Sequence, residues 1–368
     1  MRLQDICEIN PRIPRIDDDT EVSFVPMTSV SEDGEIDTSD IRPYIDVKKG
    51  YTSFKEDDVL FAKITPCMEN GKGAIARGLK NGYGCGSSEF HVLRTKGQVM
   101  PEWIYYLTSW SYFRREAEKH MTGSAGQRRV PKLYLENYEI RLPELSDQEY
   151  QVQTLTHIKE VIDYRKAELV AFEELTKARF VELTESVNTV ATRMGDIATY
   201  INGYAFKPTD WTESGLPIIR IQNLNDVNAK YNYFDGKIDS KYLVTTGDVL
   251  VSWATHLEAY IWDGDSAWLN QHIFKALFDK MPINKLYFVY ATEDALRQAF
   301  KNAHGFKPTM EHIKRRDFEN AIVKLPDMEI QNQFADFVAR TNKSKAAVQK
   351  SLDETQVLFD SLMQKYFG

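Results

Sequence analysis

Two stretches of the chain gather the side chains that proteins use to bind nucleic-acid phosphates. Residues 119–132 hold four lysines and arginines and no carboxylate, and residues 301–316 hold five and a single glutamate. Their glycines and small hydroxyl side chains let backbone N–H groups approach a phosphate. Both stretches are therefore candidate nucleic-acid contacts, although a solvated basic loop without a function would have the same composition. The candidates are Gly123, Ser124, Gly126, Gln127, Arg128, Arg129, Lys132, His304, Lys307, Thr309, Lys314, Arg315 and Arg316.

Three further segments carry side chains that can read base edges. In the major groove arginine pairs with guanine, and asparagine or glutamine pairs with adenine. Residues 63–72, 220–225 and 253–256 combine such side chains with loop-forming residues. For Lys63 and Trp253 an ordinary loop or packing role explains the residue equally well. The candidates are Lys63, Asn70, Lys72, Arg220, Gln222, Asn223, Trp253 and His256.

No catalytic pattern is complete in the sequence. Residues 10–12 (Asn-Pro-Arg) lack the second proline and the aromatic residue of an amino-methyltransferase motif, and residues 82–84 (Gly-Tyr-Gly) form an isolated glycine-rich turn. The seven histidines show no metal-ligand spacing. Residues 101–102 and 326–327 begin the carboxylate pattern of a metal-dependent nuclease without completing it. We therefore predict a chain with no catalytic residue, no bound metal and no cofactor.

The charge balance argues against a nucleic-acid partner only at first sight. The 368 residues include 46 lysines and arginines against 54 aspartates and glutamates, a net charge of −8, whereas phosphate binding needs a positive face. Residues 146–185 alone hold nine acidic and five basic side chains. Half of the excess negative charge thus lies in one short segment that need not touch DNA. The net negative charge therefore does not exclude a nucleic-acid partner.

Cysteine use and hydropathy predict a cytoplasmic protein. Cys7, Cys67 and Cys85 are too few and too scattered for a disulfide framework or a cysteine-rich zinc site. The first residues contain no apolar signal segment, and no window approaches the 18 apolar residues of a membrane span. We expect a reducing compartment and no membrane partner.

The chain repeats itself with a shift of 182–191 residues. Residues 2–6 (Arg-Leu-Gln-Asp-Ile) return as Arg-Met-Gly-Asp-Ile, and residues 58–61 (Asp-Val-Leu-Phe) return as Asp-Val-Leu-Val. Near the end of each unit, residues 136–143 match a second copy of the same pattern, which places Gln148 opposite Gln331. Landmarks in the same order indicate an internal duplication rather than coincidental strand patterns. The two basic stretches fall at the same place in both units.

Each unit changes its pattern once. Its first part predicts short strands at residues 22–25, 58–62 and 90–93, separated by turns, and a helix over residues 102–120, which together make an α+β domain. Past Pro143 and Pro326 glycine and proline are absent for about 40 residues, apart from the last glycine, and the pattern becomes helical. We predict two repeated globular domains, residues 1–145 and 186–327, each followed by a long α-helix, residues 146–185 and 328–368.

Apolar residues recur in both predicted helices at spacings of three, four and seven, which is typical of a seam against a long partner helix. A helix of about 40 residues is a rod of roughly 60 Å, too narrowly striped for the core of a small domain. We therefore expect the two helices to pack as an antiparallel coiled coil, with Thr176 and Lys345 as polar interruptions. The predicted packing residues are Leu155, Ile158, Ile162, Leu169, Phe172, Val348, Leu352, Leu358 and Leu362.

The sequence is similar over essentially its whole length to the specificity (S) subunit of type I restriction-modification systems. The resemblance rests on the repeated start of each unit, on residues 58–66, on the loop of residues 122–129 (Thr-Gly-Ser-Ala-Gly-Gln-Arg-Arg), and on residues 137–144 leading through Gln148 into the first long helix. The order of these features, duplicated with a helix after each unit, is the specific part of the match. The second unit departs from it, because residues 305–309 (Gly-Phe-Lys-Pro-Thr) stand in place of the Gly-Ser-Ala-Gly-Gln form.

The resemblance implies a non-catalytic DNA-reading subunit. Two target-recognition domains would each read one half of a bipartite, asymmetric sequence in double-stranded DNA. The helices would act as a spacer and as the docking surface for two methyltransferase (modification) subunits, joined by restriction (translocase and nuclease) subunits. The residues alone leave two other classes open: a nuclease or methyltransferase with an unrecognised site, and a scaffold that binds proteins. Turnover of DNA by the purified chain would favour the first, and a lack of sequence-specific duplex retention the second.

Overall fold

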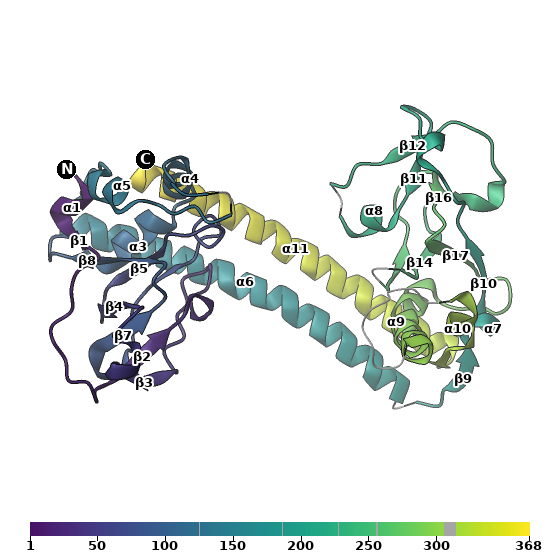
Figure 1. Cartoon of the computed structure of the whole chain (residues 1–368). Coiled ribbons are helices and arrows are strands. Elements are labelled where there is room, and N and C mark those ends of the chain that lie inside the picture. Colours follow the sequence, from purple (N-terminus) through teal and green to yellow (C-terminus); the bar gives the residue numbers. More distant parts are fainter. Residues whose placement is uncertain (125, 186, 227, 255–256, 305–313) are drawn as a thin grey trace. The chain divides into compact units, whose positions relative to one another are not determined.

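The chain forms two compact units. The computed structural model describes residues 1–124, 126–185, 187–226, 228–254, 257–304 and 314–368, with the backbone alone at 301–304. One unit consists of Met1–Lys166 with Lys350–Gly368, and the other of Ala167–Gln349. Each unit therefore contains a mixed α/β domain and a part of each of the two long helices, α6 and α11 (Figure 1).

Two four-stranded sheets build the domain of the first unit. One has the order β1-β8-β5-β6 and is antiparallel, and the other has the order β3-β2-β7-β4, with β2 and β7 parallel. All four residues of β5 (Val-Leu-Phe-Ala) are buried, as expected of a strand covered on both faces. The strands are β1 (Cys7–Ile9), β2 (Glu21–Val25), β3 (Ile41–Pro43), β4 (Thr52–Lys55), β5 (Val59–Ala62), β6 (Gly73–Ile75), β7 (Tyr83–Gly86) and β8 (Phe90–Thr95). The helices of this domain are α1 (Leu3–Ile6), α2 (Tyr44–Val47), α3 (Pro101–Ser109), α4 (Ser111–Lys119) and α5 (Lys132–Asn137).

The second unit repeats this topology. Its four-stranded sheets have the orders β10-β17-β14-β15 and β12-β11-β16-β13, the latter with β11 and β16 parallel, and a pair β18-β9 is added. The orders correspond strand by strand to those of the first unit, so the predicted duplication is confirmed. The strands are β9 (Val190–Arg193), β10 (Thr199–Asn202), β11 (Leu216–Ile219), β12 (Asn232–Phe234), β13 (Leu243–Val244), β14 (Val249–Ser252), β15 (Ala259–Ile261), β16 (Ala267–Leu269), β17 (Ile273–Leu277) and β18 (Ile322–Leu325). The helices are α7 (Met194–Ile197), α8 (Ile221–Asn225), α9 (Lys285–His304) and α10 (Arg315–Asn320).

The single helix predicted over residues 102–120 is wrong in one respect, because the structure divides it into α3 and α4. Trp110 lies between them with φ −59° and ψ 127°, which is not helical, and its N–H donates to the carbonyl oxygens of Tyr106 and Leu107. The indole is buried in the core of the unit. Burial of this large ring outweighs the helical pattern, and the kink directs α4 toward the loops described below.

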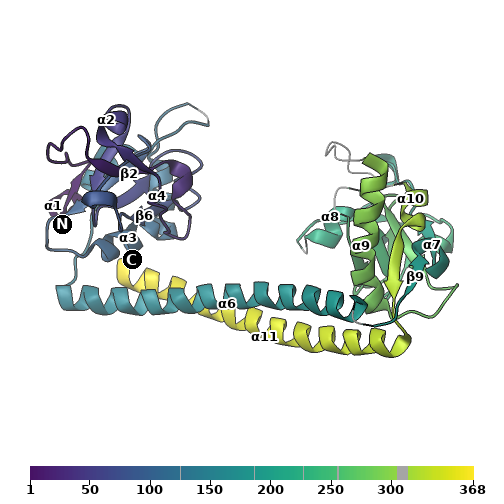
Figure 2. The ribbon, with the colours of Figure 1, turned by 90° about the horizontal axis from the view of Figure 1, so that it is seen from below.

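The long helices, α6 (Leu145–Glu185) and α11 (Met328–Phe367), pack on each other in opposite directions, as predicted (Figure 2). In the first unit Leu155, from the start of α6, shares a core with Met363, from the end of α11. In the second unit Phe180, from the end of α6, lies with its ring centroid 5.4 Å from that of Phe334, near the start of α11. The lack of glycine and proline in both segments is what lets these helices run unbroken.

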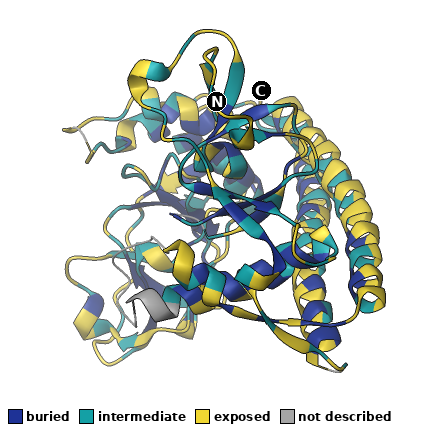
Figure 3. Cartoon of the chain, turned by 90° about the vertical axis from the view of Figure 1, so that its right-hand side faces the viewer, coloured by how far each residue is buried: buried dark blue, intermediate teal, exposed yellow. Residues whose placement is uncertain are grey.

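Of the predicted packing residues, all but Leu358 are buried or half-buried. Leu358 is 51% exposed, whereas the next residue, Phe359, packs against the core of the first unit. Heptad spacing from Phe334 passes through Thr341, Val348 and Thr355 to Phe359, so a leucine one residue earlier points off the seam. In Figure 3 both long helices show exposed residues over much of their surface. Leu155 and Ile162 are buried, and Ile158, Leu169, Phe172, Val348, Leu352 and Leu362 are half-buried.

Candidate nucleic-acid interface

The structure brings two of the predicted segments of the first unit together. Loop A (residues 63–72) follows β5, and loop B (residues 119–132) follows α4. The N–H of Thr65 donates to the carbonyl oxygen of Arg128 at 3.0 Å, and the N–H of Val130 donates to that of Lys63 at 2.9 Å. Sequence spacing gave no reason to place these loops side by side. They form one surface because β5 delivers loop A to the place where loop B returns to the sheet.

The described parts of loop B on either side of its tip, residues 122–124 and 126–127, are exposed. Thr122 and Arg129 exchange both backbone hydrogen bonds, at 2.9 and 2.8 Å. Gly123 has φ +121°, and a Cβ there would lie 2.8 Å from the carbonyl oxygen of Gln127, so only glycine fits. Gly123, Ser124, Gly126 and Gln127 are exposed, and so is Asn70 of loop A.

The two predicted arginines of loop B are paired with carboxylates that the sequence analysis did not find. Arg129 holds Glu89 with two hydrogen bonds, at 2.9 and 2.7 Å, and donates a third to the carbonyl oxygen of Gln127 at 3.0 Å. Arg128 lies 3.2 Å from Glu118 and 3.6 Å from Glu69 through one nitrogen, Nη2. Most donors of Arg129 are therefore used inside the protein, whereas Arg128 pairs with the carboxylates through Nη2 alone.

The ion pairs and the burial of these side chains shift the pKa values of two groups beside the loops. The hydrogen bonds from Arg129 hold the pKa of Glu89 below its usual value. Burial lowers the pKa of Lys63, which faces both Glu89 and Arg129. No single-sequence signal could have shown these contacts, because the partners lie 10 to 59 residues apart in the chain.

The lysines at the edge of the surface have partners too. The ammonium of Lys132 lies 3.0 Å from Glu136, one helical turn along α5. The ammonium of Lys72 donates to the carbonyl oxygen of Met27 at 3.1 Å and lines a separate, acidic cavity. The position of Lys72 therefore does not support the predicted DNA contact.

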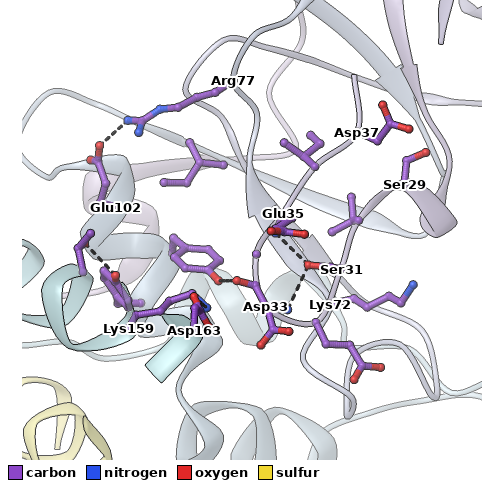
Figure 4. Close-up of a pocket in the computed structure, with 18 of the residues that line it drawn as sticks. Ser29, Ser31, Asp33, Glu35, Asp37, Lys72, Arg77, Glu102, Lys159 and Asp163 are labelled. Carbon is purple, nitrogen blue, oxygen red and sulfur yellow. Dashed lines mark hydrogen bonds and ion pairs between the residues drawn. The ribbon is translucent and has the colours of Figure 1, made fainter. Parts of the chain in front are cut away.

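That acidic cavity has a volume of about 1110 Å³ and lies between the domain and α6 (Figure 4). Its lining combines the carboxylates of Glu32, Glu35 and Asp37 with those of α3 and α6. Arg77 is already held by Glu102 and by Asp57. An excess of carboxylates repels phosphate, so loops A and B, and not this cavity, form the candidate DNA surface.

In the second unit the position of Asn223 does not support the predicted DNA contact. It is 7% exposed, its side-chain oxygen accepts the N–H of Arg220 at 3.1 Å, and its amide donates to the carbonyl oxygens of Ala229 and Lys230. The short helix α8 needs these bonds at its start. Gln222 stays exposed and donates to the carbonyl oxygen of Lys230 at 3.4 Å.

The other predicted residues of the second unit fall into four groups. Arg220 lies 5.6 Å above the Trp211 ring and donates to Asn232, at a half-buried position. The indole of Trp253 stacks on Phe274, which is the packing role that the sequence left open. Lys314, Arg315 and Arg316 are exposed, with Arg315 2.7 Å from Glu319. His256, Lys307, Thr309 and the side chain of His304 lie outside the described residues.

Within the ranges that the structure describes, no group of three or more histidine, cysteine, aspartate or glutamate side chains is arranged to hold a metal ion. Over the same ranges, no helix is both long and apolar enough to cross a bilayer.

Comparison with known proteins identifies relatives of the chain. A family model described as "Type I restriction modification DNA specificity domain" matches residues 1–173 and 187–354. The chain is 41% identical over 190 residues to the specificity subunit of the type I restriction enzyme EcoAI, and 39% identical over 193 residues to that of EcoEI, both from Escherichia coli. Each of these matches covers 50% of this chain and only 32% of the relative.

Solved structures share the fold. A chain from a structure on complex assembly and conformational transition of the type I R-M system matches with a TM-score of 0.65 at 17% identity, covering 100% of this chain and 96% of that one. The S subunit of a type I restriction-modification system from M. genitalium matches with a TM-score of 0.56 at 12% identity, covering 100% and 95%.

Proposed function

This chain belongs to the family of type I restriction-modification DNA specificity domains, and from that premise we propose that it is the non-catalytic subunit that reads the DNA target of such a system. Each of its two domains reads one half of a bipartite, asymmetric sequence. The relatives are named as specificity subunits of restriction enzymes, which supports a reader that recognises DNA for other subunits.

The observation that carries the proposal is the joined surface of loops A and B. It presents an exposed glycine-rich hairpin, the amide side chains of Asn70 and Gln127, and a guanidinium, that of Arg128, with free donors. Backbone N–H groups suit phosphates, and amide and guanidinium groups suit base edges. Arg128 is held by carboxylates, so it is already ordered before DNA arrives.

The duplicated fold supports the proposal that each domain reads one half of the target. The second domain has the same sheet orders, and its exposed Lys314, Arg315 and Arg316 precede the strand that leads into α11. Their counterparts in the first unit are the end of loop B and the start of α5, ahead of α6. We assign residues 1–145 and 186–327 to the two target-recognition domains, and residues 146–185 and 328–368 to the spacer helices.

The long helices supply the docking surface for protein partners. Tyr164 is 76% exposed, and Val170, Leu175, Val357 and Leu358 also expose apolar side chains. Where exposed apolar side chains form a contiguous patch, they mark a surface that a protein partner can cover. We assign this surface to the docking of two methyltransferase subunits, and restriction subunits join this complex. We place the assembly in the cytoplasm. It binds double-stranded DNA and no membrane. The chain itself holds no metal or cofactor in this proposal.

The experiment uses the chain assembled with its methyltransferase partner. The complex is mixed with a pool of random duplexes, and the retained sequences are read at low and at raised salt. The proposal predicts enrichment of two short half-sites separated by a gap of constant length. Retention without sequence preference would contradict it, and so would metal-dependent cleavage of DNA by the chain alone.

A further inference from the structure

Arg114 lies beneath the candidate DNA surface and is buried, with 5% of its surface exposed. It belongs to α4, and its Nη1 donates to the carbonyl oxygen of Met68 at 2.6 Å. Nη1 and Nη2 also point to the carbonyl oxygen of Lys72, at 3.5 and 3.4 Å. The guanidinium thus bridges two carbonyl oxygens that flank the tip of loop A, where Asn70 is exposed.

No carboxylate of the described chain forms an ion pair with Arg114. Its guanidinium carbon lies 5.0 Å from the centre of the Phe61 ring, and burial lowers its pKa to about 10. A buried cation without a counter-ion is costly, and an apolar side chain of similar volume usually serves a core as well or better. The cost indicates that the side chain does something that packing alone does not require.

The surroundings of Arg114 are shaped to admit it. A Cβ at Gly73 would lie 2.8 Å from the carbonyl oxygen of Leu60 and 3.3 Å from Nη2 of Arg114. A glycine at this position therefore leaves the space in which the guanidinium reaches loop A. Loop A is also closed on itself, because the N–H of Asn70 donates to the carbonyl oxygen of Pro66, and that of Lys72 to Cys67.

We propose that Arg114 is a positioning residue that sets the sequence specificity of the first half-site by fixing loop A against loop B. Its planar fork directs two nitrogens at the ends of the loop tip in a fixed geometry, which a flexible lysine ammonium or an apolar side chain does not supply. Asn70 is thereby held where its amide can meet a base edge beside Arg128. The inference rests on the proposed function and adds a residue that does not touch DNA.

The test compares Arg114→Met with Arg115→Met, a matched control because Arg115 is the exposed neighbour on α4. Each variant is assembled with the methyltransferase partner, and its affinity is measured for three duplexes: the cognate sequence, one altered in the first half-site, and one altered in the second. The second half-site is an internal control, because the other unit reads it.

We expect Arg114→Met to lose about tenfold or more of its discrimination at the first half-site, and to keep discrimination at the second within about twofold. Arg115→Met keeps both. Asn70→Ala should relax the same base positions as Arg114→Met. If Arg114→Met does not assemble, Arg114→Lys carries the same test, because it keeps the charge and loses the fork.

Unchanged discrimination at the first half-site would overturn the inference, and so would equal loss at both half-sites. These outcomes differ from a failure of the proposed function, in which the unaltered assembly itself shows no preference among the three duplexes.

Discussion

Gln148 and Gln331 make the same hydrogen bonds at the start of the two long helices. The side-chain Nε2 of each donates at 2.9 Å to the proline carbonyl oxygen five residues earlier, that of Pro143 or Pro326. The Oε1 of each accepts, at 3.0 Å, the backbone N–H of the residue that precedes a helix of the domain, Met100 before α3 or Asn284 before α9. Both glutamines are buried. Each one ties a domain to the long helix that follows it.

Replacing either glutamine by alanine should therefore destabilise its own unit. The change removes the partner of a partly buried N–H and that of a proline carbonyl oxygen, at about 1–3 kcal/mol. Gln153→Ala and Gln333→Ala are matched controls, since these exposed amides reach only Glu149 and Glu329 on their own helices, and they should stay within about 0.5 kcal/mol. Chemical unfolding of the full chain measures the free energy of unfolding of each variant. Equal losses in a buried-glutamine variant and its control would show that the hydrogen bonds of Gln148 and Gln331 do not stabilise the units.

The arginines of loop B should differ in what they do. Arg128→Ala should lower the log–log salt slope of DNA binding by about 0.9 if the side chain contacts a phosphate, or relax one base position by about 1–3 kcal/mol if it reads a base. Arg129→Ala should mainly lower thermal stability, because Glu89 then loses the partner that holds it.

Arg141→Ala, at an exposed position outside the residues of both loops, serves as the control for the two arginines. Binding of the assembled complex to cognate and scrambled duplexes at two salt concentrations separates these roles. Identical behaviour of the Arg128 and Arg129 variants would show that the carboxylate pairing has no functional meaning.

Sequence patterns predicted the architecture well because its signals are local. The absence of glycine and proline defined both long helices, and repeated landmarks such as Gln148 and Gln331 defined the duplication. The contacts of the site could not be predicted, because Glu89 meets Arg129 only after β5 and β8 pair. Asn223 and Leu358 show that residue type alone does not predict a side chain's role. Asn223 bonds to the backbone at the start of a short helix, and Leu358, one residue off the heptad, faces outward.

Acid should weaken the first unit through His91. Burial lowers the pKa of this histidine from 6.5 to about 4, and its Nε2 lies 2.8 Å from the carbonyl oxygen of Val130, at the end of loop B. The unfolded chain then binds the proton more tightly than the folded one. Stability is complete above pH 6.5 and falls as the pH drops toward 4, by about 3 kcal/mol.

The variant His91→Gln should flatten the pH dependence of unfolding over this window, whereas His157→Gln, at an exposed position of α6, should leave it unchanged. Unfolding midpoints measured from pH 7 to pH 4 check both. A variant curve as steep as that of the unaltered chain would exclude His91 as the cause.

The long helices should set the gap between the half-sites. Lys345 of α11 lies 3.1 Å from Glu173 of α6, so residues 169–175 and 343–349 face each other and can be deleted together. Removing seven residues from each helix shortens the rod by about 10 Å, or about three base pairs of DNA at 3.4 Å. Sequencing of retained duplexes should show a shorter gap between unchanged half-sites. Altered half-site bases at a constant gap would exclude a spacer role.

The most direct measurement maps methylated bases in DNA that has been exposed to the chain assembled with its methyltransferase partner. The map is made for the unaltered chain and for a chain in which residues 186–327 are exchanged for the same unit of a relative. The account predicts methylation within a bipartite sequence of which only one half changes on exchange, while the other half and the gap persist. Methylation that ignores sequence, or a change in both halves, would contradict the claim that each domain reads its own half of the target.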